Sequence, residues 1–250
     1  MLSFKYRLWS EGITMSGFRS GWMRRILAAA VLLGAAVIGT AAADTAWAQD
    51  RRQNAPGEFD FYVLSLSWSP SFCEEAAERG HSGRSQQAQC GGRPFSFVVH
   101  GLWPQYEHGF PNYCERPARR LDRNIMTSML DLMPAPGLIF NEWDKHGTCS
   151  GLSPRAYFET VRKARAAVKI PPEFIELSDP KTVSPAEIED AFVKVNPGLS
   201  NAAIAVTCNR SRLSEVRICM SKDLQFRACD EIDRRACRRD QVLMPPIRGG

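Results

Sequence analysis

The sequence predicts one α+β domain, in which helices flank a mainly antiparallel central sheet and disulfides tie the chain together. Three observations lead to this prediction. Segments rich in aromatic and β-branched residues lie near both ends of residues 59–250, segments with helix start and stop signals lie between them, and all eight cysteines fall within this part of the chain. About 200 residues are enough to bury one core, so residues 59–250 are expected to form a single domain.

Residues 1–48 have the features of a secretory signal peptide. A Met-Arg-Arg sequence precedes an apolar, alanine-rich run at 26–43, and Ala-Trp-Ala at 46–48 fits a cleavage site. The alternative is an uncleaved membrane anchor, because an apolar run of about 18 residues is near the lower limit for a spanning helix. The cleavage site and the small residues of the run favour the signal, with Met15 or Met23 as an alternative start.

The chain after the signal is nearly neutral. Five Lys/Arg and two Asp/Glu lie in residues 1–48, so signal cleavage lowers the formal net charge from +5 to +2. Such a domain gains little from counterion release, which argues against a tight, sequence-blind nucleic-acid coat protein. Two groups of arginines are interpreted as solvated basic faces, with guidance of a polyanion as the alternative: Arg116, Arg119, Arg120 and Arg123, and Arg234, Arg235, Arg238 and Arg239.

Residues 49–58 are polar and are expected to form a disordered leader. Residues 59–68 are dense in aromatic and β-branched residues and are predicted to form the first strand, which a Ser-Pro pair ends. A polar, Gly- and Gln-rich loop is expected at 73–92. Residues 95–100 are predicted to form the second strand, with His100 at its end, where a side chain is held rigidly and can face a cleft.

Four helices are expected in the middle of the chain. Prolines stop the first, 124–133, and a glycine stops the second, 138–146. A Ser-Pro pair begins the third, 153–168, and a Ser-Pro-Ala-Glu capping box begins the fourth, 184–195. Three segments towards the C-terminus are then predicted to be strands: 202–208, 213–220 and 224–228.

The even number of cysteines indicates disulfides, because exported proteins fold in oxidising compartments. A structural zinc site is the alternative, since His146 and Cys149 have a ligand-like H-x-x-C spacing. No C-x-x-C pair accompanies these two residues in the sequence, which favours disulfides.

Two short segments carry the residues best suited to catalysis. His-Gly-Leu-Trp-Pro at 100–104 and Asn-Glu-Trp-Asp-Lys-His-Gly-Thr-Cys at 141–149 contain two of the four histidines of the chain. On the second predicted helix, Glu142, Lys145 and His146 project from adjoining turns of one face. Each histidine alone would more often be structural. Together these residues meet the needs of metal-free RNA cleavage: one imidazole takes the proton of the 2′-hydroxyl, a second protonates the leaving 5′-oxygen, and a cation stabilises the charge on phosphorus.

These segments give the chain a specific resemblance to the ribonuclease T2 family. The two active-site segments of that family have the form H-G-L-W-P and H-E-W-x-K-H-G-T-C, and its first strand is similar to residues 60–70 of this chain. The resemblance covers residues 59–237, nearly the whole predicted domain. Two separate motifs in the family order are a far stronger signal than one short pattern.

By position, the resemblance implies a role for each residue. His146, neutral, takes the proton of the 2′-hydroxyl, and His100, protonated, donates a proton to the departing 5′-oxygen. The product is a 2′,3′-cyclic phosphate, which water then opens to a 3′-phosphate; DNA has no 2′-hydroxyl and cannot react. Glu142 and Lys145 stabilise the phosphorane and hold His146 in place. Asn141 departs from the family pattern, which has a histidine there, and an amide brings no charge to a phosphate.

Substrate-binding residues are expected close to the two segments. Aromatic side chains stack on bases of single-stranded RNA, and the candidates are Trp103, Tyr106, Phe110 and Tyr113, with Asn141 as a phosphate contact. Trp103 is more typical of core packing. His108 is interpreted as a solvent-exposed residue, with a phosphate contact as the alternative, and His81 is given no role.

The resemblance also implies a disulfide pairing, with two nested bridges near the C-terminus: Cys73–Cys90, Cys114–Cys149, Cys208–Cys237 and Cys219–Cys229. The second bridge would tie the loop after His100 to the end of the helix that carries His146.

The sequence therefore predicts a secreted or periplasmic endoribonuclease of low base specificity that cleaves single-stranded RNA. It is expected to act as a monomer without metal or other cofactor, and to bind neither DNA stably nor, after signal cleavage, a membrane. The alternative is a protein on the same fold, catalytically weakened by Asn141, that binds RNA or a partner protein. A metal-dependent phosphodiesterase would need clustered carboxylate or histidine ligands, which the sequence does not indicate.

Overall fold

A computed structural model describes residues 54–80, 83, 88–91 and 93–247 of the chain. The signal expected in residues 1–48, and residues 49–53 of the expected leader, lie outside this range. Among the described residues, none of the helices combines the length and apolar character that crossing a bilayer requires. Residues 54–58 are held on the domain, because the amide of Asn54 donates to the Tyr106 hydroxyl and the amide of Gly57 to the Cys149 carbonyl.

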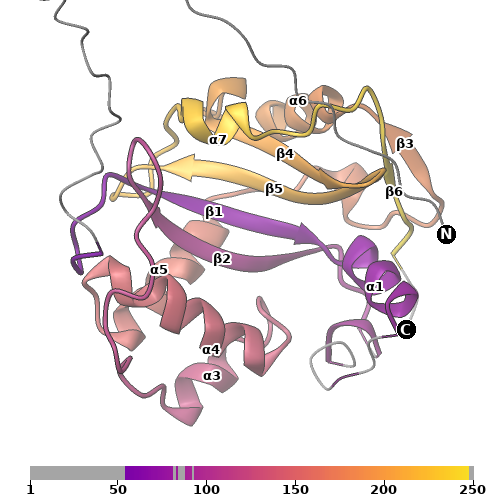
Figure 1. The fold of residues 1–250 in the computed structure, drawn as a ribbon. Coiled ribbons are helices and arrows are strands. Elements are labelled where there is room, and N and C mark those ends of the chain that lie inside the picture. The colour runs from indigo at the N-terminus through magenta and orange to yellow at the C-terminus, as the bar shows by residue number, and fades with distance from the viewer. Residues whose placement is uncertain (1–53, 81–82, 84–87, 92, 248–250) are drawn as a thin grey trace, which may run out of the picture. The chain divides into compact units, whose positions relative to one another are not determined.

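A six-stranded sheet forms the centre of the described chain (Figure 1). The strands follow the order β2-β1-β5-β6-β3, and β4 pairs with β5. All pairs are antiparallel except β5 with β6, which meet in parallel at a single register position. The strands are β1 (Phe61–Trp68), β2 (Phe97–Gln105), β3 (Lys181–Val183), β4 (Ile204–Asn209), β5 (Arg212–Met220) and β6 (Val242–Met244).

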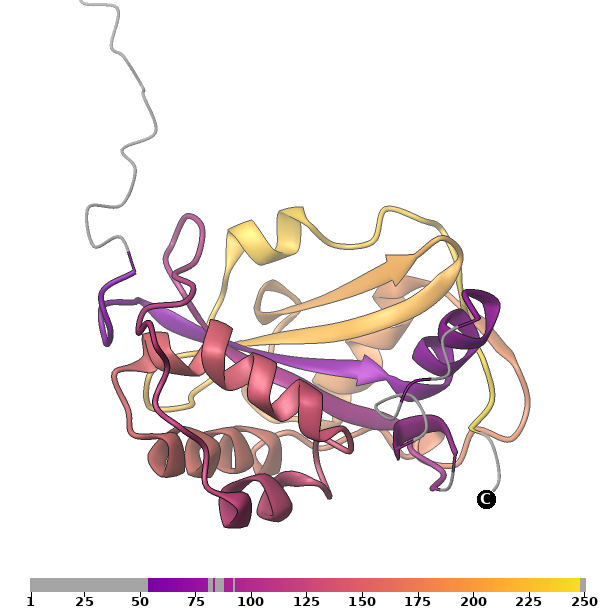
Figure 2. The same ribbon diagram turned by 60° about the horizontal axis from the view of Figure 1, so that its bottom comes forward.

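Helices cover the sheet and complete the α+β architecture that the sequence predicts. Figures 1 and 2 both show α3, α4 and α5 grouped next to β1 and β2, with α7 towards β4. The helices are α1 (Ser69–Glu78), α3 (Arg123–Met129), α4 (Pro136–Lys145), α5 (Pro154–Ala166), α6 (Pro185–Val195) and α7 (Asp230–Arg234), with 3₁₀ turns η1 (Gly147–Ser150), η2 (Pro172–Phe174) and η3 (Asn201–Ala203).

The alternation of residues along β1 explains the two-sided core. Tyr62, Leu64, Leu66 and Trp68 belong to the large core cluster that the sheet shares with α3, α4, α5 and α6. Successive side chains of a strand point to opposite faces, so the other face carries Phe61, Val63, Ser65 and Ser67. The first two of these residues pack in a smaller cluster with Ile232 of α7. The two serines leave this second face polar at its other end.

Several element boundaries differ from the sequence predictions. The expected loop 73–92 begins inside a helix, because the Ser-Pro pair after β1 opens α1 instead of a turn, and proline is well tolerated in the first turn of a helix. The expected strand 224–228 forms only an isolated bridge between Met220 and Phe226. Leu224 has a φ of 61°, in the left-handed region, which a continuous strand does not accommodate.

Other predictions hold with small shifts. The capping box of the fourth expected helix is present, since Ser184 and Glu187 each accept the backbone N–H of the other. The first expected helix ends at Met129, earlier than its prolines, and the second begins at Pro136. Four disulfides join all eight cysteines, each of them in the described residues, with the pairing implied by the resemblance: Cys73–Cys90, Cys114–Cys149, Cys208–Cys237 and Cys219–Cys229.

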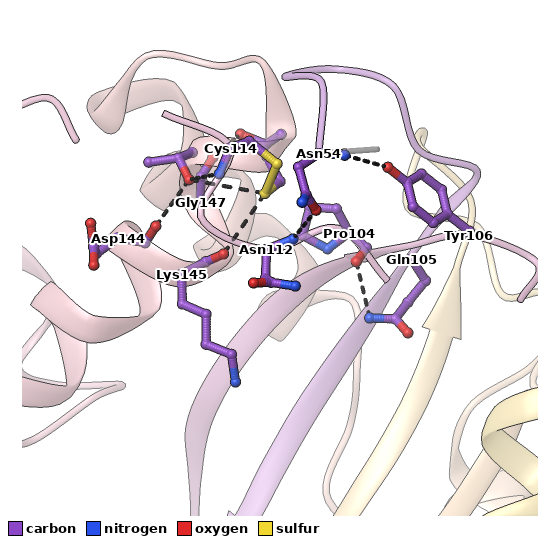
Figure 3. The surroundings of a disulfide bond; sticks show 12 residues. Asn54, Pro104, Gln105, Tyr106, Asn112, Cys114, Asp144, Lys145 and Gly147 are labelled. Carbon is purple, nitrogen blue, oxygen red and sulfur yellow. Dashed lines mark hydrogen bonds between the residues drawn. A yellow bond between two sulfur atoms is a disulfide. The ribbon is translucent and has the colours of Figure 1, made fainter. Parts of the chain in front are cut away.

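One of these bridges fastens the loop after β2 to the end of α4. Cys114 lies in the loop and Cys149 in η1, and the amide of Cys114 also donates to Thr148 Oγ1 at 3.1 Å. The amide of Tyr113 donates to the carbonyl of Lys145 at 2.8 Å. The disulfide and these hydrogen bonds therefore hold the backbone of Lys145 in place. Figure 3 shows the Lys145 side chain extending away from the disulfide, which leaves its ammonium group unobstructed by the bridge.

We expect the double variant Cys114→Ala/Cys149→Ala to lose both stability and activity. Opening a native disulfide typically costs ~2–4 kcal/mol, and here it also frees the segment that follows His146. The matched control is Cys73→Ala/Cys90→Ala, which opens a bridge between α1 and the loop that follows it. Thermal unfolding should show destabilisation in both variants, whereas RNA cleavage at a temperature where both are folded should fall only in the first. Equal activity loss in the two variants would contradict a role of the bridge in the site.

Candidate active site

His100 occupies a β-bulge in the middle of β2. Ser65 of β1 pairs with Gly101 and Leu66 pairs with Val99, so His100 is the extra residue between two register positions. The expectation that His100 ends the second strand is therefore wrong, because β2 continues to Gln105. A bulge turns side chains away from the regular alternation. Here it aims the imidazole, with 35% of its side chain exposed, out of the sheet.

A carboxylate and a guanidinium on β5 flank the imidazole of His100. Nδ1 of His100 lies 2.5 Å from Oε1 of Glu215, and Glu215 is only 6% exposed. Nε and Nη2 of Arg217 both donate to Oε2 of Glu215, at 2.9 and 2.7 Å. Burial would raise the pKa of Glu215, but the hydrogen bond and charge of His100, together with Arg217, lower it to about 2.

A second buried carboxylate faces the other side of the His100 ring. Oε1 of Glu142, on α4, lies 3.6 Å from Nε2 of His100. Oε2 of Glu142 accepts the indole N–H of Trp103 at 2.7 Å. Burial raises the pKa of Glu142, although His100, Trp103 and Lys145 oppose the rise. Glu142 therefore joins α4 to β2 and places a carboxylate next to the ring nitrogen of His100 that Glu215 does not contact.

His146 is the C-cap residue of α4 and is 5% exposed. Its ring lies 5.4 Å from Trp103 and 6.3 Å from Phe110, measured between ring centroids. Its Nδ1 is buried and has no hydrogen-bond partner among the described residues. Burial, followed by the charges of Lys145 and His100, lowers the pKa of His146 to about 3. A protonated imidazole would need partners for two N–H groups, so this surrounding favours the neutral ring.

The surroundings thus shift the pKa values of the two histidines in opposite directions. Burial alone would lower the pKa of His100, but the hydrogen bond with Glu215 and the charges of Glu215 and Glu142 outweigh it and raise the pKa above its ordinary value. Trp103 contacts both rings, since its centroid also lies 5.3 Å from that of His100. The surroundings therefore favour a cationic imidazole on one side of Trp103 and a neutral one on the other, the pair that acid–base catalysis needs.

Two glycines of the sequence motifs permit this close packing. A Cβ on Gly101 would lie 2.0 Å from Oε2 of Glu142 and 2.4 Å from Nε1 of Trp103. A Cβ on Gly147 would lie 2.4 Å from Cε3 of Trp143. No side chain fits at these distances, so each histidine is followed by glycine because its neighbours pack against bare backbone.

The remaining candidates on α4 lie at the surface of the site. Lys145 is half-buried and precedes His146, and its charge acts on both His146 and Glu142. Asn141 is exposed and immediately precedes Glu142. Asn141 therefore faces solvent at the start of the helical segment that carries the other candidate residues.

The expected base-binding residues separate into two groups. Phe110 and Tyr113 are 40% and 36% exposed, and the guanidinium of Arg116 lies 4.2 Å from the ring centroid of Tyr113. Tyr106 is 6% exposed and packs in the core, so the stacking role expected for it does not fit its position. His108 is exposed and lies 3.7 Å from Glu231, which gives its ring an ionic partner within the protein.

The described residues include no cluster of three or more His, Cys, Asp or Glu side chains with the arrangement of a metal site. The alternative of a zinc site at His146 and Cys149 is wrong, because the sulfur of Cys149 forms a disulfide with Cys114 and is not free to bind a metal. Glu215 and Arg217 are the site residues that the sequence analysis missed. The available signal was a pair of charged residues two apart, and therefore on one face, in a segment already predicted to be a strand.

Known ribonucleases resemble this chain in sequence. The model of the ribonuclease T2 family matches residues 59–229. A probable ribonuclease of Haemophilus influenzae is 33% identical over 185 residues, which cover 71% of this chain and 63% of that protein. A ribonuclease of Aeromonas hydrophila is 43% identical over 110 residues, covering 44% and 46% of the two chains. The chain thus spans about half to two thirds of the length of these two relatives.

Solved structures agree with the fold. An RNase-related protein from Calystegia sepium superposes with a TM-score of 0.62 at 22% identity, covering 76% of this chain and 99% of the other. RNase NT in complex with 5′-AMP superposes with a TM-score of 0.56 at 24% identity, with the same coverage. At these identities the likeness concerns the fold alone, whereas the family model extends over both histidine-containing motifs and three of the four disulfides. The chain belongs to the ribonuclease T2 family.

Proposed function

We propose that this protein is an endoribonuclease that cleaves single-stranded RNA with low base specificity, using two histidines and no metal or other cofactor. The observation that carries the proposal is the opposite protonation preference of the two imidazoles beside Trp103. Burial and positive neighbours lower the pKa of His146 and so favour its neutral ring, and two carboxylates raise the pKa of His100 and so favour its cationic ring. A base and an acid are thereby available in one site at the same pH.

In the proposed reaction, neutral His146 accepts the proton of the ribose 2′-hydroxyl as the oxygen attacks phosphorus. The bond between phosphorus and the 5′-oxygen breaks, and protonated His100 donates its proton to that oxygen. The products are a 2′,3′-cyclic phosphate and a 5′-hydroxyl end. In a second step the proton transfers run in reverse, and water opens the ring to a 3′-phosphate. Each proton transfer typically contributes 10²–10⁴-fold in rate.

Lys145 and Glu142 assist in this scheme. The ammonium of Lys145, next to His146 along the chain, stabilises the charge that collects on the phosphorane oxygens. Glu142 orients the site by binding Trp103 and facing Nε2 of His100. Phe110, exposed at the edge of the His146 ring, is the best-placed aromatic platform for a base.

We further propose that the protein acts as a monomer outside the cytoplasm, in the periplasm or the medium. The disulfides support an oxidising compartment, because such bridges are rare in reducing ones. The expected signal at residues 1–48 agrees with this location.

The function is tested with a fluorescent oligoribonucleotide digested in excess EDTA. Cleavage should persist and should leave 2′,3′-cyclic phosphate and then 3′-phosphate ends, resolved by mass spectrometry. A 2′-O-methyl group at one position should abolish cleavage at that linkage alone, and the matching DNA strand should stay intact. Activity that vanishes in EDTA and returns with a divalent metal, or cleavage at the methylated linkage, would contradict the mechanism.

We expect a plot of kcat/KM against pH to show a broad maximum, with one limb below and one above the ordinary histidine pKa of 6.5. The base must be neutral, which His146 is above its pKa of about 3, so the acid limb lies well below 6.5. The acid must be protonated, and the pKa of His100 is raised, so the alkaline limb lies above 6.5. The apparent values belong to the coupled pair. Circular dichroism at each pH controls for unfolding, and an acid limb centred near 6.5 would contradict the assignment of a neutral, buried base.

We expect Asn141→His to tighten substrate binding, because a cationic imidazole binds phosphate about twice as strongly as a neutral amide does. The gain should be about 1 kcal/mol, visible mainly as a lower KM, and should shrink as the pH rises and the new ring loses its proton. Asn141→Gln is the matched neutral control and should bind as the native protein does. If native protein is nearly inert and Asn141→His raises kcat a hundredfold or more, the binding-protein alternative is correct instead.

A further inference from the structure

The carboxylate of Glu215 is placed to act on the proposed reaction through His100. We infer that Glu215 is a positioning residue that holds the His100 ring by Nδ1 and stabilises its cationic form, and that Arg217 fixes Glu215 for this task. The inference rests on the proposed function, since it assigns how the acid of that reaction is prepared. Neither residue belongs to the two motifs that carry the family resemblance.

The sheet makes this contact possible across an intervening strand. On the site-facing side of β1, Ser65 pairs with Gly101 of β2 and with Arg217 of β5, and Ser67 pairs with Glu215. Neighbouring strands lie ~4.8 Å apart, so His100 and Glu215 must span about twice this distance. Two serines, the smallest polar side chains, leave room for the imidazole and the carboxylate to meet above β1. A large side chain at either position would occupy that space.

The contact determines which ring nitrogen delivers the proton. Nδ1 is engaged by Oε1 of Glu215 at 2.5 Å, so Nε2 is the nitrogen that remains for the leaving oxygen. Nε2 points to the side of the ring where Glu142 lies, on the helix that also carries His146. A carboxylate on one nitrogen of a histidine fixes both the tautomer and the orientation of the other nitrogen.

The charges around His100 favour its protonated form, and Glu215 is the anion in direct contact with the ring. The charged or titratable groups that face the ring are Glu215 and Arg217 from β5 and Glu142 and His146 from α4, whereas β1 presents serines. The pKa of Glu142 is raised by burial, so this carboxylate is the weaker anion as the pH falls. Glu215, with its pKa held at about 2, stays ionised throughout the working range. The guanidinium carbon of Arg217 also lies 5.2 Å from the ring centroid of Trp103. This contact helps to hold Arg217 on the side of the sheet where His100 lies.

The decisive variant is Glu215→Gln, which keeps the size of the side chain and removes its charge. His100 should then titrate lower by about one pH unit or more in histidine-detected NMR. The alkaline limb of kcat/KM should move down with it, and kcat should fall. Glu189→Gln is the matched control, because Glu189 is a half-buried carboxylate that accepts the amide of Val206 away from His100. It should leave the His100 titration and the alkaline limb unchanged.

Arg217→Gln provides the second variant should Glu215→Gln not fold. It leaves the carboxylate in place but removes the two hydrogen bonds that hold it, so kcat should fall even though a cation that opposes protonation of His100 is also lost. An unchanged His100 titration in folded Glu215→Gln, or an unchanged kcat in folded Arg217→Gln, would overturn the inference and leave these residues with a merely structural role. The NMR titration requires no turnover. Native protein that fails to cleave RNA would refute the proposed function, while the titration would still decide the role of Glu215.

Discussion

The site depends on one interaction above all, the contact of the His100 imidazole with the buried carboxylate of Glu215. A buried imidazole tends to lose its proton, because a low-dielectric surrounding disfavours charge. The nearby anions reverse this tendency for His100, and each carboxylate is itself held by a donor: Glu215 by Arg217 and Glu142 by Trp103. Pairing with these donors offsets part of the cost of burying the two carboxylates.

Several features of the fold allow the contact between His100 and Glu215 and bring the other site residues next to it. The bulge in β2 releases His100 from the regular alternation, and the serines of β1 clear the path to β5. Because β2 lies at one end of the strand order, α4 can bring Glu142 and His146 next to it. Gly101 then allows Glu142 to approach within a distance that any side chain at that position would block. The disulfide between Cys114 and Cys149 holds the loop after β2 to the turn after His146.

The surroundings of His146 have the opposite effect on an imidazole from those of His100. It lies at the end of α4 among aromatic rings, next to Lys145 and without a carboxylate partner, so its surroundings favour the neutral ring. The neighbours of two identical side chains thus favour the cationic form of one and the neutral form of the other. This difference, on which the proposed two-histidine reaction rests, arises from contacts that join β2, β5 and α4.

The sequence predicted the parts of the site that are local. Residues four apart on a helix share a face, so the sequence alone places Glu142 and His146 together. Glu215 could not be placed, because its contact with His100 joins residues 115 positions apart and depends on strand register. The bulge at His100 was also missed, since it depends on how β2 pairs with β1. The burial of Tyr106 depends on packing against distant elements, which an aromatic residue in a loop sequence does not reveal.

The most direct test of the account compares two leaving groups in two variants. A dinucleoside phosphate needs an acid to expel its 5′-oxygen, whereas a nucleoside 3′-(4-nitrophenyl phosphate) releases a stable phenolate and does not. We predict that His146→Ala loses at least ~10²-fold in kcat on both substrates, and that His100→Ala loses as much on the dinucleotide but far less on the nitrophenyl ester. Equal losses on both substrates for His100→Ala, or relief of His146→Ala by the nitrophenyl group, would contradict the division of acid and base between the two histidines.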